Sequence, residues 1–312
     1  MTPIKGRFEL RHVGVRNHTG IDDRALRKAA AKGTLTRVRR GVYVHAATWK
    51  SLGPLDRYRL VVAAAAEAAT GPLTISHRSA AVLWGVPLVG RYPDVVDVLT
   101  SVASGARTEH GFARHTTRDH TTEVTTKDGI ALTSLPRTVV DLAAALPFPE
   151  AVAAVDWALA NGCKREHLAD LTRRLGNAAS GRGLSVIAFA DRRAGSPGES
   201  ISRALMHQLG FPPPELQVPF RDGNGLIGVV DFYWADFALI GEFDGGVKYA
   251  DPTLLGGRSP SAVVVDEKRR EDRLRALGPR VTRWVWDDLS RERLGRQLTL
   301  AGLPRFSSST AI

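Results

Sequence analysis

Three carboxylates in the last third of the chain lie in segments whose other residues favour buried β-strands. Asp231 lies late in the run GLIGVVDFYW, and Glu242 and Asp244 lie late in the next run, ALIGEFDG. Residues two apart on a strand share a face, so pairing of the two runs as a hairpin would bring all three carboxylates together. An unpaired buried carboxylate is costly, whereas a hard divalent cation with oxygen ligands removes that cost. The pattern therefore predicts a site for Mg²⁺ or Mn²⁺ that activates water for phosphodiester hydrolysis.

Two other interpretations of these carboxylates stay open. They can belong to a nuclease-like fold that has lost its activity, or they can be exposed charges that protect a strand edge from pairing. Glu199, in the predicted helix GESISRALMHQLG, carries less weight, because an acidic residue at the start of a helix also interacts favourably with the helix dipole.

Segments between about residues 195 and 290 resemble relatives of the very-short-patch repair endonucleases within the PD-(D/E)XK superfamily. The resemblance rests on SPGESISRALMHQLGFPPPELQ, VVDFYW, IGEFDGGVKY and DEKRREDRLRALGPRVTRWVWDDL. It implies a catalytic site formed by Glu199, Asp231, Glu242 and Asp244. Asp244 stands where the superfamily motif has a catalytic lysine, and Lys248 occupies a position where the closer relatives often carry His. Lys248 would then contact a phosphate or activate water.

The positive charge of the protein is concentrated near the N-terminus. The whole chain has a formal net charge of +11, and residues 1–60 alone contribute +10, from 14 Lys and Arg against 4 Asp and Glu. Residues 61–190 are neutral and residues 191–312 contribute +1. A concentration of this kind in one short segment is typical of a surface that contacts nucleic-acid phosphates.

The basic segment predicts a short helix followed by a tight hairpin. DDRALRKAAAK reads as a helix that ends at Gly33, and TLTRVRRGVYV contains two β-prone runs that turn around Arg39, Arg40 and Gly41. A helix followed by a basic hairpin is the outline of a winged helix, which binds double-stranded DNA through the helix and the wing. Ordinary solvation of a basic helix is the alternative. The predicted DNA-binding residues are Arg24, Arg27, Lys28, Lys32, Arg37, Arg39 and Arg40.

Residues from about 10 to 160 resemble the AbiEi-type antitoxins of type IV toxin–antitoxin systems. The resemblance rests on the basic segment together with SHRSAAVLWGVPL and DGIALTSLPRTVVDLAAALP. It implies a winged-helix DNA-binding domain joined to a second domain, repression of the protein's own operon, and a cognate toxin as a partner. Ser76, His77 and Ser79 are adjacent in this region, and we interpret Ser76 as a helix cap rather than part of a catalytic triad.

These elements predict an α/β protein, α+β overall, in three parts. Residues 1–54 form a winged-helix unit, and residues 55–190 form a mostly helical middle domain with a β-rich insert between about residues 94 and 133. Residues 191–312 form a restriction-endonuclease-like mixed sheet flanked by helices. The expected order there is helix, two strands, helix, strand, helix.

Several function classes are not expected. No apolar run is long enough to span a bilayer, and the sequence has neither a secretory signal nor a nucleotide-binding glycine motif. A single cysteine, Cys163, suits the cytoplasm. The leading hypothesis is a DNA-binding protein with a metal-dependent endonuclease domain. The alternatives are a non-catalytic regulator or antitoxin that keeps the nuclease-like fold as a scaffold, and a partner-binding module. The partner-binding module would use Trp234, Trp284 and Trp286 as exposed aromatic residues, although aromatic residues in strands usually belong to the core.

Overall fold

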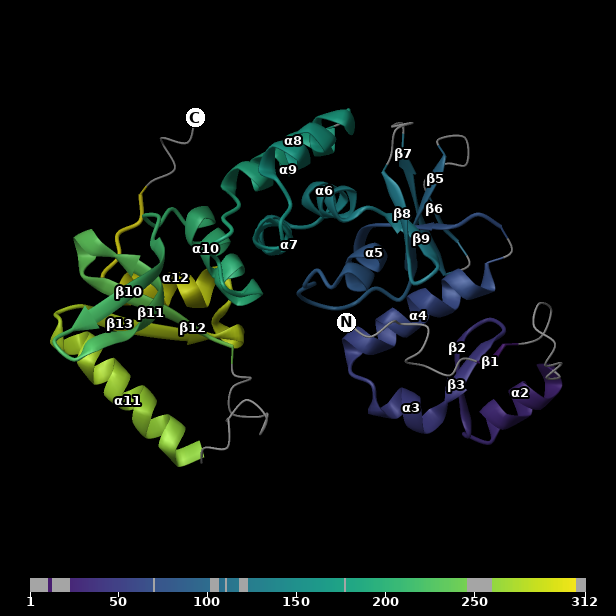
Figure 1. The fold of residues 1–312 in the computed structure, drawn as a ribbon, viewed down its shortest axis with the longest axis horizontal. Coiled ribbons are helices and arrows are strands. Elements are labelled where there is room, and N and C mark those ends of the chain that lie inside the picture. Colours follow the sequence, from purple (N-terminus) through teal and green to yellow (C-terminus); the bar gives the residue numbers. More distant parts are fainter. Residues whose placement is uncertain are drawn as a thin grey trace. The chain divides into compact units, whose positions relative to one another are not determined.

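The fold is taken from a computed structural model that describes residues 11–12, 23–69, 71–101, 107–109, 111–117, 123–176, 178–245 and 260–306 (Figure 1). The chain divides into two compact units. Unit 1 comprises Met1–Ala145 and Cys163–Ser185, and unit 2 comprises Leu146–Gly162 and Val186–Ile312. The predicted division into three parts, with boundaries at residues 54 and 190, stays a prediction.

The helix and hairpin expected in the basic segment are present in unit 1. Helix α2 (Asp23–Ala31) is followed by β2 (Leu35–Arg39) and β3 (Val42–His45), and β1 (Arg11–His12) joins them in a sheet of order β1-β3-β2. Gly41 has a φ of +76°, which a glycine adopts without strain, and it turns the chain between β2 and β3. Leu26, Leu35 and Tyr43 are buried together and hold the helix against the hairpin.

The rest of unit 1 is a six-stranded sheet with helices. After α3 (Ala46–Ser51) and α4 (Pro54–Ala68), the sheet has the order β6-β7-β5-β4-β9-β8. Its strands are β4 (Thr74–Ile75), β5 (Val96–Ser101), β6 (Arg107–Glu109), β7 (Phe112–Thr117), β8 (Val124–Lys127) and β9 (Ile130–Thr133). The helices are α5 (His77–Trp84), α6 (Leu135–Ala145), α8 (Arg165–Arg174) and most of α9 (Ala178–Phe189). Strands β5 to β9 lie in the range of residues 94–133, for which the sequence predicts a β-rich insert.

Unit 2 is a four-stranded mixed sheet with flanking helices. The sheet order is β10-β11-β12-β13, in which the first three strands are antiparallel and β12 and β13 are parallel. The strands are β10 (Glu215–Asp222), β11 (Gly225–Trp234), β12 (Leu239–Asp244) and β13 (Arg280–Val285). The helices are α7 (Phe148–Ala160), α10 (Pro197–Gln208), α11 (Pro260–Ala276) and α12 (Arg291–Leu300). The expected mixture of helices and sheets is confirmed, and β10 is a strand that the expected element order lacks.

Helix α7 belongs to unit 2 because a buried ion pair ties it to α10. Asp156 in α7 accepts two hydrogen bonds from Arg203 Nη2, at 2.9 and 3.0 Å, and its side chain is 1% exposed.

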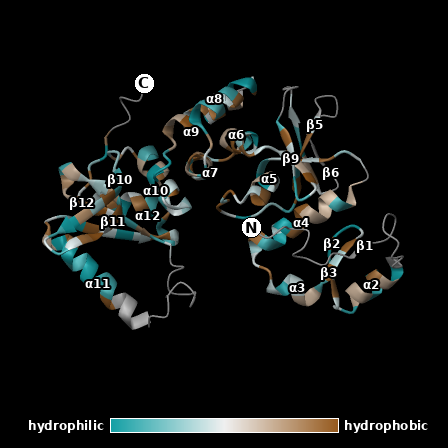
Figure 2. Ribbon diagram, viewed as in Figure 1, coloured by the Kyte–Doolittle hydropathy of each residue, from teal (hydrophilic) through white to brown (hydrophobic). Residues whose placement is uncertain are grey.

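Helix α11 is strongly hydrophilic for most of its length (Figure 2). Its sequence mixes acidic and basic residues, as a helix with one solvated face requires.

Two of the three tryptophans in the partner-binding hypothesis lie in the core of unit 2. Trp234 is 3% exposed and donates to the carbonyl of Pro212 at 2.8 Å, and Trp284 is 1% exposed and donates to Ser202 Oγ at 2.8 Å. A buried indole N–H needs a partner, and both have one. The expectation that they are exposed was wrong, and Trp286 alone of the three is exposed, at 41%. Among the described residues, no helix is long and apolar enough to cross a membrane.

Candidate functional site

The helix α2 presents a basic face to solvent. Leu26 is 3% exposed and faces the hairpin, whereas Arg24, Arg27 and Lys28 are exposed. Their spacing of three and four residues places the three cations on one side of the helix. Lys32, just after the helix, is exposed as well. The four basic side chains predicted to bind DNA from this segment are therefore exposed, and their contact with DNA stays a prediction.

The three arginines of the hairpin have two different environments. Arg37 and Arg40 are exposed. Arg39 instead lies with its guanidinium carbon 3.8 Å from the centre of the Phe112 ring in β7, and its Nη1 donates to the carbonyl of Gly111 at 3.4 Å. Burial lowers the pKa of Arg39. Arg39 thus packs the hairpin against the six-stranded sheet, which leaves Arg37 and Arg40 as the hairpin cations that face solvent.

Sequence reasoning gave no sign of the separate role of Arg39. The three hairpin arginines differ little in local context, and Phe112 is far from them in the chain. The contact forms because β7 and the hairpin are adjacent in unit 1. The sequence around Arg39 has no pattern that indicates this adjacency. An aromatic ring beside an arginine is a favourable but non-local arrangement.

In unit 2, a glutamine links two of the predicted catalytic carboxylates. Gln217 Nε2 in β10 donates to Glu199 Oε2 at 2.8 Å and to Asp231 Oδ1 at 3.4 Å. Glu199 is 8% exposed, and its Oε2 also accepts from the backbone N–H of Gly195 at 2.8 Å. Asp231 Oδ2 accepts from the backbone N–H of Phe243 at 2.8 Å.

The backbone of Gln217 has a φ of +54°. A residue other than glycine in the left-handed region stores strain, and such residues are enriched at functional sites. The strained residue here bridges Glu199 on α10 and Asp231 on β11. This link was missed at the sequence level, because nothing near Gln217 signals a positive φ.

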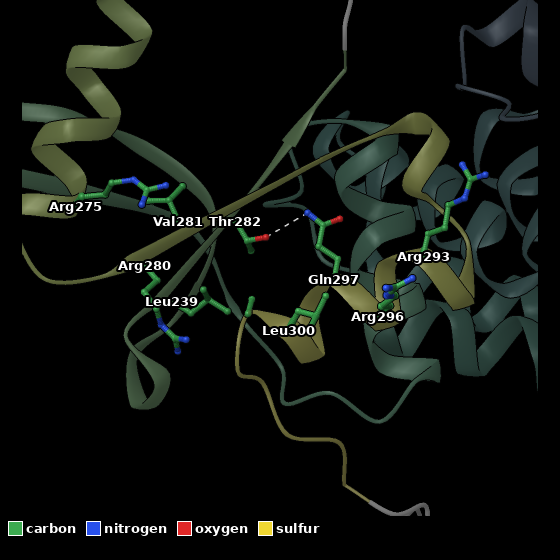
Figure 3. Close-up of a pocket in the computed structure, with 10 residues that line it drawn as sticks. Leu239, Arg275, Arg280, Val281, Thr282, Arg293, Arg296, Gln297 and Leu300 are labelled. Carbon is green, nitrogen blue, oxygen red and sulfur yellow. Dashed lines mark hydrogen bonds between the residues drawn. The ribbon is translucent and has the colours of Figure 1, made fainter.

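Strand β13 directs its arginines to opposite faces. Successive side chains on a strand alternate, so Arg280 and Thr282 share one face and Arg283 projects from the other. A groove beside this edge strand is lined by Arg280, Val281 and Thr282 together with residues of α12 (Figure 3). On the second face, Arg283 reaches the carboxylate of Glu242.

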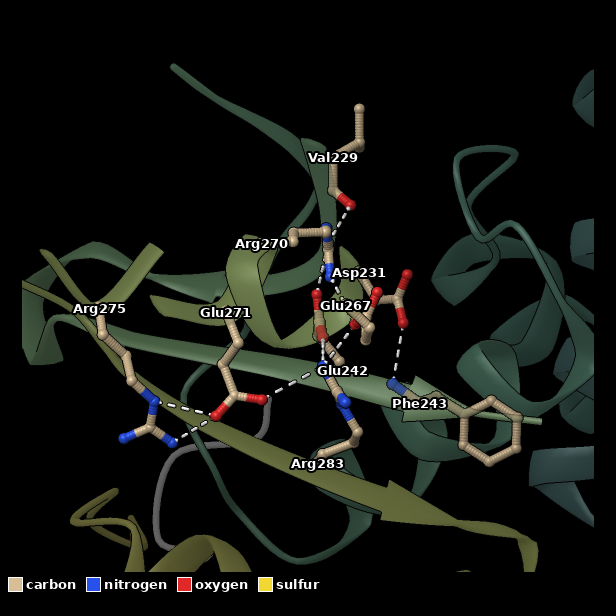
Figure 4. A network of polar contacts seen from close by, with 9 residues as sticks. All are labelled: Val229, Asp231, Glu242, Phe243, Glu267, Arg270, Glu271, Arg275 and Arg283. Atoms are coloured by element: carbon tan, nitrogen blue, oxygen red, sulfur yellow. Dashed lines mark hydrogen bonds and ion pairs between the residues drawn. The ribbon is translucent and has the colours of Figure 1, made fainter. Parts of the chain in front are cut away.

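Glu242 is neutralised by two arginines (Figure 4). Arg270 Nη2 donates to Glu242 Oε1 at 2.6 Å, and Arg283 Nη2 donates to Oε2 at 2.7 Å. Glu267 Oε1 accepts from both arginines, at 3.1 and 2.8 Å. Burial alone would raise the pKa of Glu242, but the hydrogen bonds and charges of Arg270 and Arg283 hold this pKa below its ordinary value. We call Glu242, Glu267, Arg270 and Arg283 the Glu242 network.

The predicted metal ligands lie on the paired strands β11 and β12. Pairing of Phe232 with Gly241 brings Asp231 and Glu242 onto neighbouring strands, and Asp244 ends β12 half-buried. Among the described residues, no group of three or more His, Cys, Asp or Glu side chains is arranged to hold a metal ion. Lys248 lies outside the described residues. Metal binding by Asp231, Glu242 and Asp244 stays a prediction.

The acidic and basic side chains of α11 form ion pairs, as expected for a solvated helix with charges of both signs. Arg275 donates to Glu271 at 2.8 and 2.9 Å along the helix. Arg273 pairs with Asp222 in β10 through bonds of 2.8 and 2.7 Å. Arg270 pairs with Glu267 along the helix at 3.1 Å and also with Glu242 in β12 at 2.6 Å.

Unit 1 contains a second concentration of buried polar groups. His77 stacks on His115 with ring centres 3.6 Å apart, and His115 Nε2 lies 2.7 Å from Asp97 Oδ1. Asp141 accepts from Arg137 Nε at 2.9 Å, and both side chains are 4% exposed. His77 has a φ of +45°. Ser76 is the N-cap residue of α5, as expected, but its side chain makes no capping hydrogen bond, and its Oγ lies 3.1 Å from His77 Nδ1.

Burial shifts the two central groups of this cluster in opposite senses. Desolvation, together with the neighbouring His115 and Arg137, lowers the pKa of His77 to about 3, and Asp97 opposes this shift. Desolvation raises the pKa of Asp141 to about 6, although Arg137 opposes this shift. His77 is therefore neutral at neutral pH, and its environment disfavours protonation.

Comparison with known proteins supports the resemblance at the N-terminus. Residues 13–45, whose described part contains α2, β2 and β3, match the family described as "Transcriptional regulator, AbiEi antitoxin". In sequence, this segment is therefore similar to AbiEi-type regulators. The resemblance of residues 195–290 to repair endonucleases stays a prediction.

Two curated relatives are uncharacterised proteins of Mycobacterium tuberculosis, from strains CDC 1551 / Oshkosh and ATCC 25618 / H37Rv. Each is 32% identical to this chain over 157 residues, which are 50% of this chain and 55% of the relative. The chain thus spans about half the length of the curated relatives it matches. The crystal structure of the RV2827C protein from Mycobacterium tuberculosis aligns with a TM-score of 0.33 and 16% identity, over 59% of this chain and 69% of that one.

Proposed function

We propose that the protein is a DNA-binding transcriptional regulator of the antitoxin type. The main support for this proposal is that two features occur in the same segment. Residues 13–45 match the antitoxin regulator family, and the same segment carries exposed basic side chains on both its helix and its hairpin. Cations at these places suit a winged helix, in which the helix enters the major groove and the wing contacts the phosphate backbone.

The partners and the compartment follow from this assignment. The proposed ligand is double-stranded DNA, with the operator of the protein's own operon as the specific site, and a cognate toxin is the proposed protein partner. The proposed compartment is the cytoplasm, where such an operator would lie. The proposal needs no nucleotide cofactor.

Binding of labelled duplex DNA to the full chain tests the proposal. The probe is the DNA upstream of the protein's own gene, with a shuffled duplex of equal length as the comparison. We expect tighter binding to the upstream DNA, and we expect Arg24, Arg27 and Lys28 replaced together by Ala to weaken binding to both duplexes. Equal affinity of this variant and the unchanged protein would contradict docking through α2.

A second candidate function is a metal-dependent endonuclease. The observation in its favour is the strained Gln217, which holds the carboxylates of Glu199 and Asp231 near one another. In this proposal Asp231, Glu242 and Asp244 hold Mg²⁺ or Mn²⁺, while Glu199 and Lys248 support the site. The ion would supply an activated water and polarise the phosphate.

The donor set fits a metal only in part. Asp231 and Glu199 are acidic and lie near one another, but both oxygens of Glu242 already accept hydrogen bonds from arginines. We therefore place the regulator first. Plasmid cleavage with Mg²⁺ or Mn²⁺, abolished by Asp231→Ala, and a melting temperature raised by the same ions would support the endonuclease. Absence of both effects at millimolar ion would exclude it.

A further inference from the structure

A groove in unit 2 gathers arginines from three elements. It has a volume of about 570 Å³ and lies beside β13 and α12 (Figure 3). Its cations are Arg275 at the end of α11, Arg280 at the start of β13, and Arg293 and Arg296 on α12. Thr282 and Gln297 lie between them, joined by a hydrogen bond of 3.3 Å. None of the residues that line the groove is Asp or Glu, although unit 2 contains many acidic residues elsewhere.

The sequence of α12 fixes which of its faces borders the groove. Leu294 and Leu298 are fully buried and anchor the helix to the core of unit 2. Arg293 and Arg296 are exposed and three residues apart, so they lie on neighbouring positions of another face. Arg280, Val281 and Thr282 line the groove from β13, which is the edge strand of its sheet. Rigid elements therefore place these cations.

Most of these guanidinium charges have no carboxylate partner among the described residues. Arg280 donates to the carbonyl of Phe237 at 3.4 Å, and Arg293 donates to the carbonyl of Asp287 at 2.9 Å. A carbonyl orients a guanidinium but does not neutralise it. Arg296 makes no ion pair with the described part of the chain, whereas Arg275 is paired with Glu271. The groove thus keeps the positive charge of Arg280, Arg293 and Arg296.

We propose that this groove binds the phosphodiester backbone of duplex DNA and gives unit 2 a DNA contact of its own. The inference rests on the proposed DNA-binding function and extends it to a surface outside the α2 and hairpin region. Guanidinium groups match phosphate oxygens in charge and geometry, and the Thr282 hydroxyl, which accepts from Gln297 Nε2, is an additional donor. An acidic protein is the weaker occupant, because no lining residue is one of the aromatic anchors that dominate protein interfaces.

The salt dependence of DNA binding by the full chain tests the groove. The groove variant replaces Arg280, Arg293 and Arg296 by Ala. The control variant replaces Arg192, Arg221 and Lys268 by Ala, which removes the same charge from exposed positions of unit 2 away from the groove lining. Arg221 lies on β10, at the other end of the sheet from β13. The probe is a labelled duplex of about three helical turns, so that two surfaces can engage it.

We expect the groove variant to bind more weakly than the control variant, by roughly tenfold at moderate salt, with a slope of log affinity against log salt that falls by about 0.9 for each lost phosphate contact. Its melting temperature should match that of the control variant, since the replaced side chains are exposed. Equal slopes and affinities for the two variants would overturn the groove while leaving the regulator intact. Failure of the unchanged protein to bind any duplex would instead contradict the proposed function itself.

Discussion

The α2 and hairpin region and the Glu242 network are both rich in arginine, but they use the charge in different ways. In the first region Arg37 and Arg40 face solvent, and Arg39 alone of the hairpin arginines is held against an aromatic ring. In the second, Arg270 and Arg283 are turned inward and are neutralised by Glu242 and Glu267. The comparison shows that the count of basic residues does not define a phosphate-binding surface. The local pairing of each guanidinium decides whether its charge is available to a ligand.

The largest expected effect comes from breaking the Glu242 network. Glu242→Gln leaves Arg270 and Arg283, whose side chains are 22% and 30% exposed, beside a neutral amide. Both arginines keep Glu267 as a partner but lose the charge of Glu242, so we expect a loss of about 2 kcal/mol in the free energy of unfolding of unit 2. Urea unfolding measures this loss.

The matched control for the network is Asp272→Asn, an exposed carboxylate on the same helix as Arg270. An exposed position of this kind should change stability by less than about 0.5 kcal/mol. Equal losses of stability for the two substitutions would show that pairing of Arg270 and Arg283 with Glu242 does not stabilise unit 2. The contrast between these paired arginines and the exposed arginines of the hairpin would then be weaker.

The buried cluster of unit 1 should make stability depend on pH in two opposing ways. The pKa of His77 is lowered to about 3, so its contribution is complete above the ordinary pKa of 6.5 and is lost as the pH falls toward 3. The pKa of Asp141 is raised to about 6, so its contribution is complete below the ordinary pKa of 3.8 and is lost as the pH rises toward 6. Between about pH 4 and 6 the two contributions offset one another.

His77→Asn separates these contributions, because Asn tolerates the left-handed backbone of residue 77. We expect unit 1 of the variant to lose stability as the pH rises from 4 to 6. The difference in unfolding free energy between the unchanged protein and the variant should change by on the order of 1 kcal/mol per pH unit in this window. Parallel pH profiles of the two proteins would show that His77 is not held neutral by its surroundings.

A smaller effect is expected where the hairpin meets the sheet of unit 1. Arg39→Ala removes the contact with Phe112 and should cost about 1 kcal/mol of stability. Arg40→Ala, at the neighbouring exposed position, should change stability by less than about 0.5 kcal/mol. Thermal unfolding compares the two variants, and an equal loss of stability would remove the distinction between a packing arginine and a solvated one.

The sequence predicted elements more reliably than it predicted contacts between them. The helix that ends near Gly33 and the hairpin that turns at Gly41 follow from local signals, and so do the strands that carry Asp231 and Glu242. The contacts of Arg39 with Phe112, of Gln217 with Glu199, and of Glu242 with Arg283 join residues far apart in the chain. Such pairs depend on which strands become neighbours, and no short-range pattern encodes that.

The carboxylates illustrate the same limit. Their position on neighbouring strands could be predicted from two β-prone runs, but their partners could not. A buried glutamate is stabilised equally well by a metal ion or by two arginines, because either removes the penalty of an unpaired charge. The sequence therefore left open how the charge of Glu242 is compensated.

The salt dependence of duplex binding by the hairpin variant tests the central claim most directly. The central claim is that Arg37 and Arg40 contact DNA phosphates and that Arg39 packs the hairpin. Replacing Arg37 and Arg40 together by Ala should lower the magnitude of the slope of log affinity against log salt by about 0.9 for each lost phosphate contact, while the melting temperature stays close to that of the unchanged protein. An unchanged slope would place the hairpin outside the DNA interface and contradict the account.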